Sequence, residues 1–257
     1  KNSLKAGAAA LFIPSLLNSC EEETQDNTQE EIKQIPQSEP WFEISLAAYS
    51  LHRAFEAKTL VNKDFPLIAK EEYGISAVEL LNTYFIDKAK DQAYLTELNR
   101  TCKEAGVKNL LIMSEREGDL ADPNERNRKE SVLNHFKWVE AAASLGCHSI
   151  RVNSRGQGTA DQVKEAGIDG LTQLGQFAKE RNINIIVENH GVFSSDGAWL
   201  SSLIKLVDME NVGTLPDFGN FCIKGRPMGV GECEQPYDRY LGVEQLMPFA
   251  IGVSDKS

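Results

Sequence analysis

The sequence is short of positive charge and of histidine. Its 257 residues contain 27 Lys and Arg against 38 Asp and Glu, with only 4 His, and the formal net charge is −11. A surplus of negative charge opposes association with a phosphate backbone, which argues against nucleic acid as a partner. The 41% of hydrophobic residues is ordinary for a globular domain, and the length allows a substantial core.

The sequence also lacks an apolar run long enough to cross a bilayer as a helix. The stretch AGAAALFIPSLLNSC, residues 6–20, has instead the length of a secretory signal core. Its end, Leu17-Asn18-Ser19-Cys20, resembles a bacterial lipoprotein signal box, in which the Cys becomes lipidated; the alternative is a chance Cys after an apolar run. We predict a signal peptide at 1–20, lipidation of Cys20, and an extracytoplasmic protein held at the periplasm or cell envelope by this anchor alone.

Residues 21–40 carry seven acidic residues and one Lys, with few apolar side chains. Such a segment cannot bury enough surface to become ordered. We predict an acidic, disordered tether here, followed by one folded domain at 41–257.

Regular cysteine spacing is missing as well. Apart from Cys20, the cysteines are Cys102, Cys147, Cys222 and Cys233, without the close spacing of a zinc site or a disulfide scaffold. Cys222 and Cys233 could pair within one loop in an oxidising compartment, but the sequence does not require it. We therefore treat these cysteines as structural.

What the sequence does contain is a recurring unit of a helical stretch followed by a short apolar strand. Examples are EEYGISAVELL at 71–81, KEAGVKNLLIM at 103–113, ASLGCHSIRVN at 143–153 and KERNINIIVEN at 179–189. Glycines at the helix ends suit a left-handed terminal residue, and the continuous apolar runs suit buried parallel strands. With 42–50, 212–218 and 248–254 added, seven strands alternate with helices, notably 87–105, 124–145, 160–181 and 196–208.

This alternation indicates either an open doubly wound sheet or a (β/α)₈ TIM barrel. No Gly-x-Gly-x-x-Gly follows the first strand, which weakens the doubly wound, dinucleotide-binding alternative. We predict an α/β TIM barrel. Because a barrel needs eight strands, we also expect the natural protein to continue beyond Ser257 with the eighth.

Acids end two of the predicted strands. NIIVENHG at 184–191 reaches Glu188, and GTLPDFGNF at 213–221 reaches Asp217. In a barrel the βα loops at the carboxyl ends of the strands carry the chemistry. The same end should present other polar residues, which we take as candidate substrate contacts: His52, Glu79, Arg151, Asn153, Asn220 and Lys256. A salt bridge between Glu79 and Arg151 would explain both of those residues equally well.

The motifs VENHG and LPDFGNF, with AVEL on the second strand and GVSDKS on the seventh, resemble the xylose isomerase-like barrel superfamily of sugar phosphate isomerases and epimerases. The resemblance implies that Glu188 and Asp217 bind one divalent cation, Mn²⁺, Mg²⁺ or Zn²⁺, and that Glu188 is also one of the catalytic bases. It further implies a His on strand seven and a Glu on strand eight as ligands. Here Ser254 stands at the His position, and the eighth strand is not in the sequence.

His190 lies two residues beyond Glu188, so on a continuing strand both side chains face the same side. His190 could then replace the missing ligand or act as an acid or base. The resemblance predicts proton transfer next to a carbonyl of a sugar, and outside the cytoplasm a free or oxidised sugar is favoured over a phosphorylated one. The alternatives are a keto-sugar lyase or hydrolase, a non-catalytic carbohydrate-binding lipoprotein, and an endonuclease IV-like enzyme, which the acidity and the few His disfavour.

Overall fold

The computed structural model describes residues 42–225 and 231–255. The predicted signal peptide, the tether, Cys20 and Lys256 lie outside these described residues. The expectations for them therefore stay predictions.

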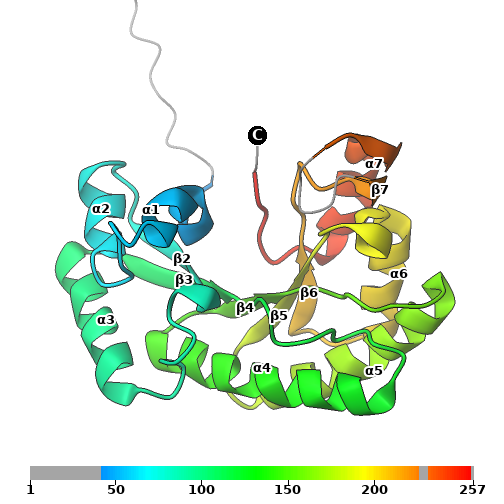
Figure 1. Cartoon of the computed structure of the whole chain (residues 1–257), viewed down its shortest axis with the longest axis horizontal. Coiled ribbons are helices and arrows are strands. Elements are labelled where there is room, and N and C mark those ends of the chain that lie inside the picture. Colours follow the sequence, from blue (N-terminus) through cyan, green and yellow to red (C-terminus); the bar gives the residue numbers. More distant parts are fainter. Residues whose placement is uncertain (1–41, 226–230, 256–257) are drawn as a thin grey trace, which may run out of the picture. The chain divides into compact units, whose positions relative to one another are not determined.

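Six parallel strands form one sheet whose spatial order follows the chain from β1 to β6 (Figure 1). The strands are β1 Leu46–Ala47, β2 Ala77–Leu81, β3 Lys108–Met113, β4 Ser149–Val152, β5 Asn184–Glu188 and β6 Val212–Leu215. A doubly wound sheet reverses its strand order at a switch point, and this sheet does not. The arrangement is that of a TIM barrel, as predicted.

Helices connect the strands and follow the outside of the curved sheet (Figure 1). They are α1 His52–Glu56, α2 Phe65–Glu71, α3 Gln92–Ala105, α4 Glu125–Leu145, α5 Ala160–Lys179, α6 Gly197–Val207 and α7 Arg239–Leu246, with 3-10 turns η1 Ala48–Leu51, η2 Asn82–Tyr84, η3 Val192–Ser195 and η5 Met247–Phe249. In the part of the chain that the structure describes, none of these helices has the length and apolar character needed to cross a membrane.

The helix boundaries follow from capping chemistry. Gly106 and Gly146 end α3 and α4 at φ of 66° and 72°, the left-handed conformation in which a Cβ is unfavourable. At the start of α5, Thr159 and Gln162 form a reciprocal capping box. The predicted ends of these helices are therefore correct to within a few residues.

The core lies between the sheet and its helices. Every residue of β4 and β6 is buried, polar ones included, as expected for parallel strands that are covered on both faces. Trp138 of α4 is fully buried and packs edge-on against Phe85, with ring centroids 5.2 Å apart. Arg151 is the one charged residue of β4, and its burial requires compensating partners at the end of the sheet.

The two outer predicted strands are shorter in the structure. Only Leu46 and Ala47 of the predicted 42–50 strand pair with β2, because the chain then turns into η1. The predicted strand at 248–254 runs parallel to β6 through the isolated bridges Thr214–Ala250 and Asp217–Ser254. Among the described residues no strand closes the sheet between this segment and β1, so the eighth strand stays a prediction.

An antiparallel hairpin, which the sequence analysis did not predict, follows β6. Its strands are β7 Cys222–Gly225 and β8 Cys233–Pro236, and a disulfide joins Cys222 to Cys233. The sequence left this pairing open, and the structure forms it. Cys102 and Cys147 are free and buried, and burial raises the pKa of the Cys102 thiol to about 11, which agrees with a structural role.

Candidate active site

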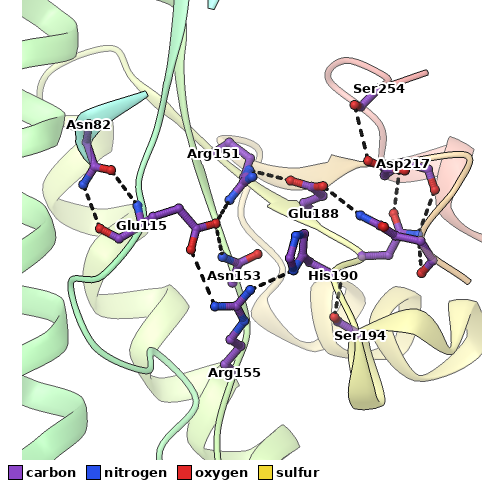
Figure 2. A network of polar contacts seen from close by, with 12 residues as sticks. Asn82, Glu115, Arg151, Asn153, Arg155, Glu188, His190, Ser194, Asp217 and Ser254 are labelled. Atoms are coloured by element: carbon purple, nitrogen blue, oxygen red, sulfur yellow. Dashed lines mark hydrogen bonds and ion pairs between the residues drawn. The ribbon is translucent and has the colours of Figure 1, made fainter. Parts of the chain in front are cut away.

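Arg151 lies at the centre of a polar network at the carboxyl ends of β3 to β6 (Figure 2). Its Nη1 donates to Oε1 of Glu115 at 2.5 Å, and its Nε lies 2.5 Å from Oε2 of Glu188. The second contact is an ion pair in which the N–H of Nε is not aligned with the oxygen well enough to form a hydrogen bond. The side chains of Arg151 and Glu188 are 5% and 1% exposed, so each buried charge has an opposite charge beside it.

Several carboxylates act on this one cation. Burial by itself would lower the pKa of Arg151, but the charges of Glu188, Glu115 and Asp217 raise it above its ordinary value. The pKa of Glu115 is shifted downward. Burial alone would raise this pKa, but the charge and hydrogen bond of Arg151, with smaller contributions from Asn153 and Arg155, lower it. Arg151 is therefore a permanent positive charge at the end of the sheet.

Glu115 is the second anchor of the network. It follows β3, and its Oε1 also accepts a hydrogen bond from Nδ2 of Asn153 at 2.9 Å. Nη1 of Arg155 lies 3.5 Å from the other carboxylate oxygen. Asn82, at the end of β2, exchanges hydrogen bonds with the backbone of Glu115 and so fixes the position of the loop (Figure 2). The ends of β2, β3 and β4 are thereby held together.

His190 is held in a defined tautomer. Nη2 of Arg155 lies 2.7 Å from Nδ1 of His190, and because a guanidinium only donates, Nδ1 must accept and the proton must sit on Nε2. Burial lowers the pKa of His190, and the charges of Arg151 and Arg155 act in the same direction against that of Glu188. The ring is thus a neutral imidazole at neutral pH, with Nε2–H as its donor.

Asp217 and Glu188 are connected through amides. The side chain of Asn189, fully buried, donates to the backbone carbonyl of Asp217 at 3.0 Å and accepts from its backbone N–H at 2.7 Å. Asn220 donates from Nδ2 to Oε1 of Glu188 at 3.0 Å. The carboxylate of Asp217 accepts from the backbone N–H of Gly219 at 2.8 Å, and the Ser254 hydroxyl lies 3.5 Å away on its other oxygen (Figure 2).

These contacts bear on the divalent cation that the resemblance implies. Both oxygens of Glu188 already have partners, and one of those partners is the guanidinium of Arg151. Asp217 contacts a backbone N–H and the hydroxyl that stands where the resemblance implies a His. Residues 42–225 and 231–255 contain no group of three or more His, Cys, Asp or Glu suited to a metal ion. As arranged, the residues do not fit a divalent cation, since a bound ion would have to displace an existing positive charge.

The other candidate residues lie at different distances from this network. Glu79 accepts a hydrogen bond from Ser45 Oγ at 2.6 Å, whereas Arg151 forms its ion pairs with Glu115 and Glu188. His52 begins α1 and stacks on Tyr49, with its Nδ1 3.0 Å from the carbonyl of the same residue. The structure therefore brings together Glu188, His190, Asp217, Arg151, Asn153 and Asn220.

The sequence analysis missed two residues of the network. Arg155 lies in the loop after β4, only two residues beyond Asn153, and its charge so close to a strand end was the available signal. Asn189 lies inside the motif VENHG between Glu188 and His190, and an uncharged amide beside these residues gave no separate signal of a site. Neither residue breaks a sequence pattern, so the arrangement in space had to reveal their roles.

A parallel sheet of this order, with charged and amide side chains gathered at its carboxyl ends, defines the class of TIM-barrel proteins, whose active sites are built at that face. Residues 68–251 match the xylose isomerase-like TIM barrel family, and the chain belongs to this family. No curated protein matches the chain in sequence.

Solved structures share the fold at low sequence identity. The 3-keto-D-glucoside 4-epimerase from E. coli aligns with a TM-score of 0.60 and 16% identity, over 76% of this chain and 74% of that one. A D-tagatose 3-epimerase-like protein aligns with a TM-score of 0.61 and 19% identity, over 84% and 76%. The IOLI protein with a bound zinc atom aligns with a TM-score of 0.62 and 15% identity, over 83% and 88%. At these identities the likeness establishes the fold.

Proposed function

We propose that the chain is a sugar isomerase or epimerase that moves a proton on a carbon next to a carbonyl of a free or oxidised sugar. The observation that carries the proposal is that the buried Glu188 carboxylate, at the end of β5, and the neutral His190 ring, two residues further on, belong to one polar network. Enolisation of a sugar needs a base and a donor at the carbonyl oxygen, and a carboxylate and a neutral imidazole N–H can supply these two roles. Family membership and the sugar epimerases among the similar structures support it.

Glu188 is the base in this proposal. Its carboxylate takes the proton from the carbon beside the carbonyl, and the electron pair of the broken C–H bond moves into the carbonyl to form an enediolate. In an isomerase the resulting acid of Glu188 returns the proton to the former carbonyl carbon, while the hydroxyl proton on the other carbon passes to the former carbonyl oxygen. In an epimerase a second group delivers a proton to the opposite face of the same carbon.

His190 and Arg151 stabilise the enediolate. The Nε2–H of His190 donates a hydrogen bond to the oxygen on which negative charge develops, and this donor is fixed by Arg155 before the sugar binds. Arg151 places a permanent positive charge within reach of the same region. Because the two groups are already oriented, little reorganisation is needed as the charge develops.

The divalent cation on Glu188 and Asp217 remains a prediction. Metal-bound structures among the similar proteins support it, including one with zinc and one from Mycobacterium smegmatis with magnesium. The partners of Glu188 argue against it. No step above depends on the ion.

The test is solvent exchange. The full chain is incubated in D₂O with ketohexoses and with keto-sugars, and deuterium at the carbon next to the carbonyl is followed by NMR. Glu188→Gln keeps the shape of the site and should slow exchange by about 100-fold or more, while sugar affinity changes far less. Glu140→Gln, on the outer surface of α4, is the matched control and should exchange at the wild-type rate.

A second function is favoured by one observation. Ser254 stands at the His position implied by the resemblance, and Glu188 is held by Arg151, which together would suit a barrel that binds sugars without turning them over. Sugar binding by the wild type without deuterium exchange for any sugar would select this carbohydrate-binding function. Absence of both binding and exchange would reject the two proposals together.

A further inference from the structure

A cavity of about 230 Å³ lies beside the network, between the loop that follows β3 and the helix α4. Glu115, Asn153 and Arg155 belong to both the cavity wall and the network around Arg151. Arg155 also bonds His190, so a single side chain contacts the cavity and the proposed catalytic ring. A ligand at the β5 end could therefore extend into this space.

The cavity wall contains buried polar atoms that have no hydrogen-bond partner among the described residues. Ser114 is 2% exposed and its Oγ is unpaired, as is Oδ1 of Asn153. The orientation of the Asn153 amide is fixed, because its Nδ2 donates to Glu115. Leaving such atoms unpaired costs about 1–3 kcal/mol each, and in native proteins an unpaired buried group usually marks a bound water or a ligand.

His135 adds a further acceptor to the same wall. It is 3% exposed, and its Nδ1 lies 2.8 Å from the backbone carbonyl of Ser131, so Nδ1 carries the proton and Nε2 is left with a lone pair. Burial lowers the pKa of His135, which keeps the ring neutral. The cavity wall offers acceptors at Asn153 Oδ1, His135 Nε2 and the carboxylate of Asp119, donors at the guanidinium groups of Arg116 and Arg155, and at Ser114 a hydroxyl that can do either.

The polar and charged groups of the cavity wall indicate which kind of ligand would fit. Both signs of charge line the cavity, for example Glu115 and Arg155, so neither a cation nor an anion is favoured as such. Within the described ranges no cluster around it is suited to a metal ion. Donors and acceptors side by side suit a ligand whose groups can do both, and a neutral polyhydroxylated ring carries such hydroxyls on every side.

The size limits the ligand further. At about 30 Å³ for each water in the liquid, the cavity holds the equivalent of about eight waters. That volume suits one sugar ring and not a long oligosaccharide or a large aromatic group. An ordinary water-filled cavity is the competing explanation, and the experiment below separates the two.

We propose that this cavity is a subsite for a second sugar ring, so that the substrate is a disaccharide-like sugar whose reacting ring lies over Glu188 and His190. The proposal rests on the proposed function, because it names the substrate class of that same site. Ser114 is a specificity-determining residue for the second ring and does not touch the reacting carbon. Arg155 is the residue that the two rings would share.

The experiment compares a ketose with its disaccharides. Binding of D-fructose, lactulose, turanose and isomaltulose to the full chain is measured by calorimetry, because the three disaccharides attach a second ring at different hydroxyls of fructose. We expect at least one of them to bind about 10-fold or more tightly than fructose. Ser114→Ala should lower the affinity for that disaccharide by about 3- to 10-fold, the effect of one lost hydrogen bond, and leave the affinity for fructose unchanged.

Ser131→Ala is the matched control. Ser131 is also 2% exposed with an unpaired Oγ, but it does not line the cavity, so its substitution should alter neither affinity. The subsite would be overturned if Ser114→Ala still bound the disaccharide more tightly than fructose by the wild-type factor, or if it lost affinity for fructose by the same factor. Fructose binding without any disaccharide advantage would do the same while leaving the proposed function intact, whereas failure of the wild type to bind any of the four sugars would count against both proposals.

Discussion

The Nε atom of Arg151 lies 2.5 Å from Oε2 of Glu188, and this contact joins the ends of β4 and β5 at a point where neither side chain is more than 5% exposed. A buried pair of this kind gains little over apolar packing, but it is costly to break from one side. The position of the proposed base therefore depends on a residue of the neighbouring strand.

Removing Arg151 should destabilise the fold. Arg151→Met leaves Glu115 and Glu188 without their opposite charge, and we expect a loss of about 3–5 kcal/mol in the free energy of unfolding. Urea denaturation measures this. Arg100→Met serves as the control, because it breaks an exposed pair with Glu104 and should cost about 1 kcal/mol or less. Equal costs for the two substitutions would show that the buried pair is not formed.

Stability should fall in mild acid through the buried histidines. Burial lowers the pKa of His135 and of His190 below the ordinary 6.5, so the unfolded chain binds their protons more readily than the folded one. Their stabilisation is complete above about pH 6.5 and is lost as the pH falls toward the lower folded values. Urea unfolding at a series of pH values should show this slope, and His135→Gln should reduce it.

Glu115 should contribute in a separate, more acidic range. Its pKa is lowered in the folded state, so its stabilisation is present above its ordinary value of 4.5 and is lost as the pH falls further. Glu115→Gln should flatten the stability profile below pH 4.5 and, because the charge of Glu115 raises the pKa of both His135 and His190, move the histidine range slightly lower. A uniform shift of the whole profile would contradict this assignment.

Arg151 also decides how the site treats divalent ions. Because the guanidinium already lies against Glu188, we expect weak Mn²⁺ binding by the wild-type chain and tighter binding by Arg151→Met, measured by calorimetry. Unfolding curves of the variant establish first that it remains folded under the conditions used. Tight binding by the wild type that is lost in both Glu188→Gln and Asp217→Asn would instead establish the shared ion predicted from the sequence.

The lipid anchor predicted at Cys20 can be tested directly. Expressed with a functional signal in a Gram-negative host, the protein should sediment with membranes and incorporate a labelled fatty acid, and Cys20→Ala should abolish both. Cys102→Ala is a suitable control, because that thiol is buried inside the domain. Labelling that persists in Cys20→Ala would reject the lipoprotein prediction.

The fold was predictable where one physical signal dominated. Continuous apolar runs such as 184–188 specify buried parallel strands, and Gly106 and Gly146 mark helix ends through their backbone conformation. The hairpin was not predictable in the same way. None of the residues of Cys222–Gly225 and Cys233–Pro236 is buried, so these strands show no apolar pattern, and a disulfide joins them.

The site was predictable as a set of residues but not as a set of contacts. The ends of the strands identified Glu188, Asp217, Arg151 and Asn153 from sequence position alone. The sequence did not determine which acid pairs with Arg151, because Glu79 lies on β2, Glu115 follows β3 and Glu188 ends β5, and the reach of the side chains decides the pairing. The cavity could not be predicted from the sequence either, because Ser114 and His135 come from separate segments and only the folded chain brings them to one wall.

The side-chain amide of Asn189 forms the two hydrogen bonds, one donated and one accepted, that the backbone of a further strand residue would form. The last backbone pairing between β5 and β6 joins Glu188 to Leu215, and beyond it the Asn189 amide gives one hydrogen bond to the backbone of Asp217 and takes another from it. Separating the two loops would break both bonds at once. We therefore expect Glu188 and Asp217 to keep a constant spacing, so that a ligand at this end of the barrel would be selected by its own shape rather than by adjustment of the two acids.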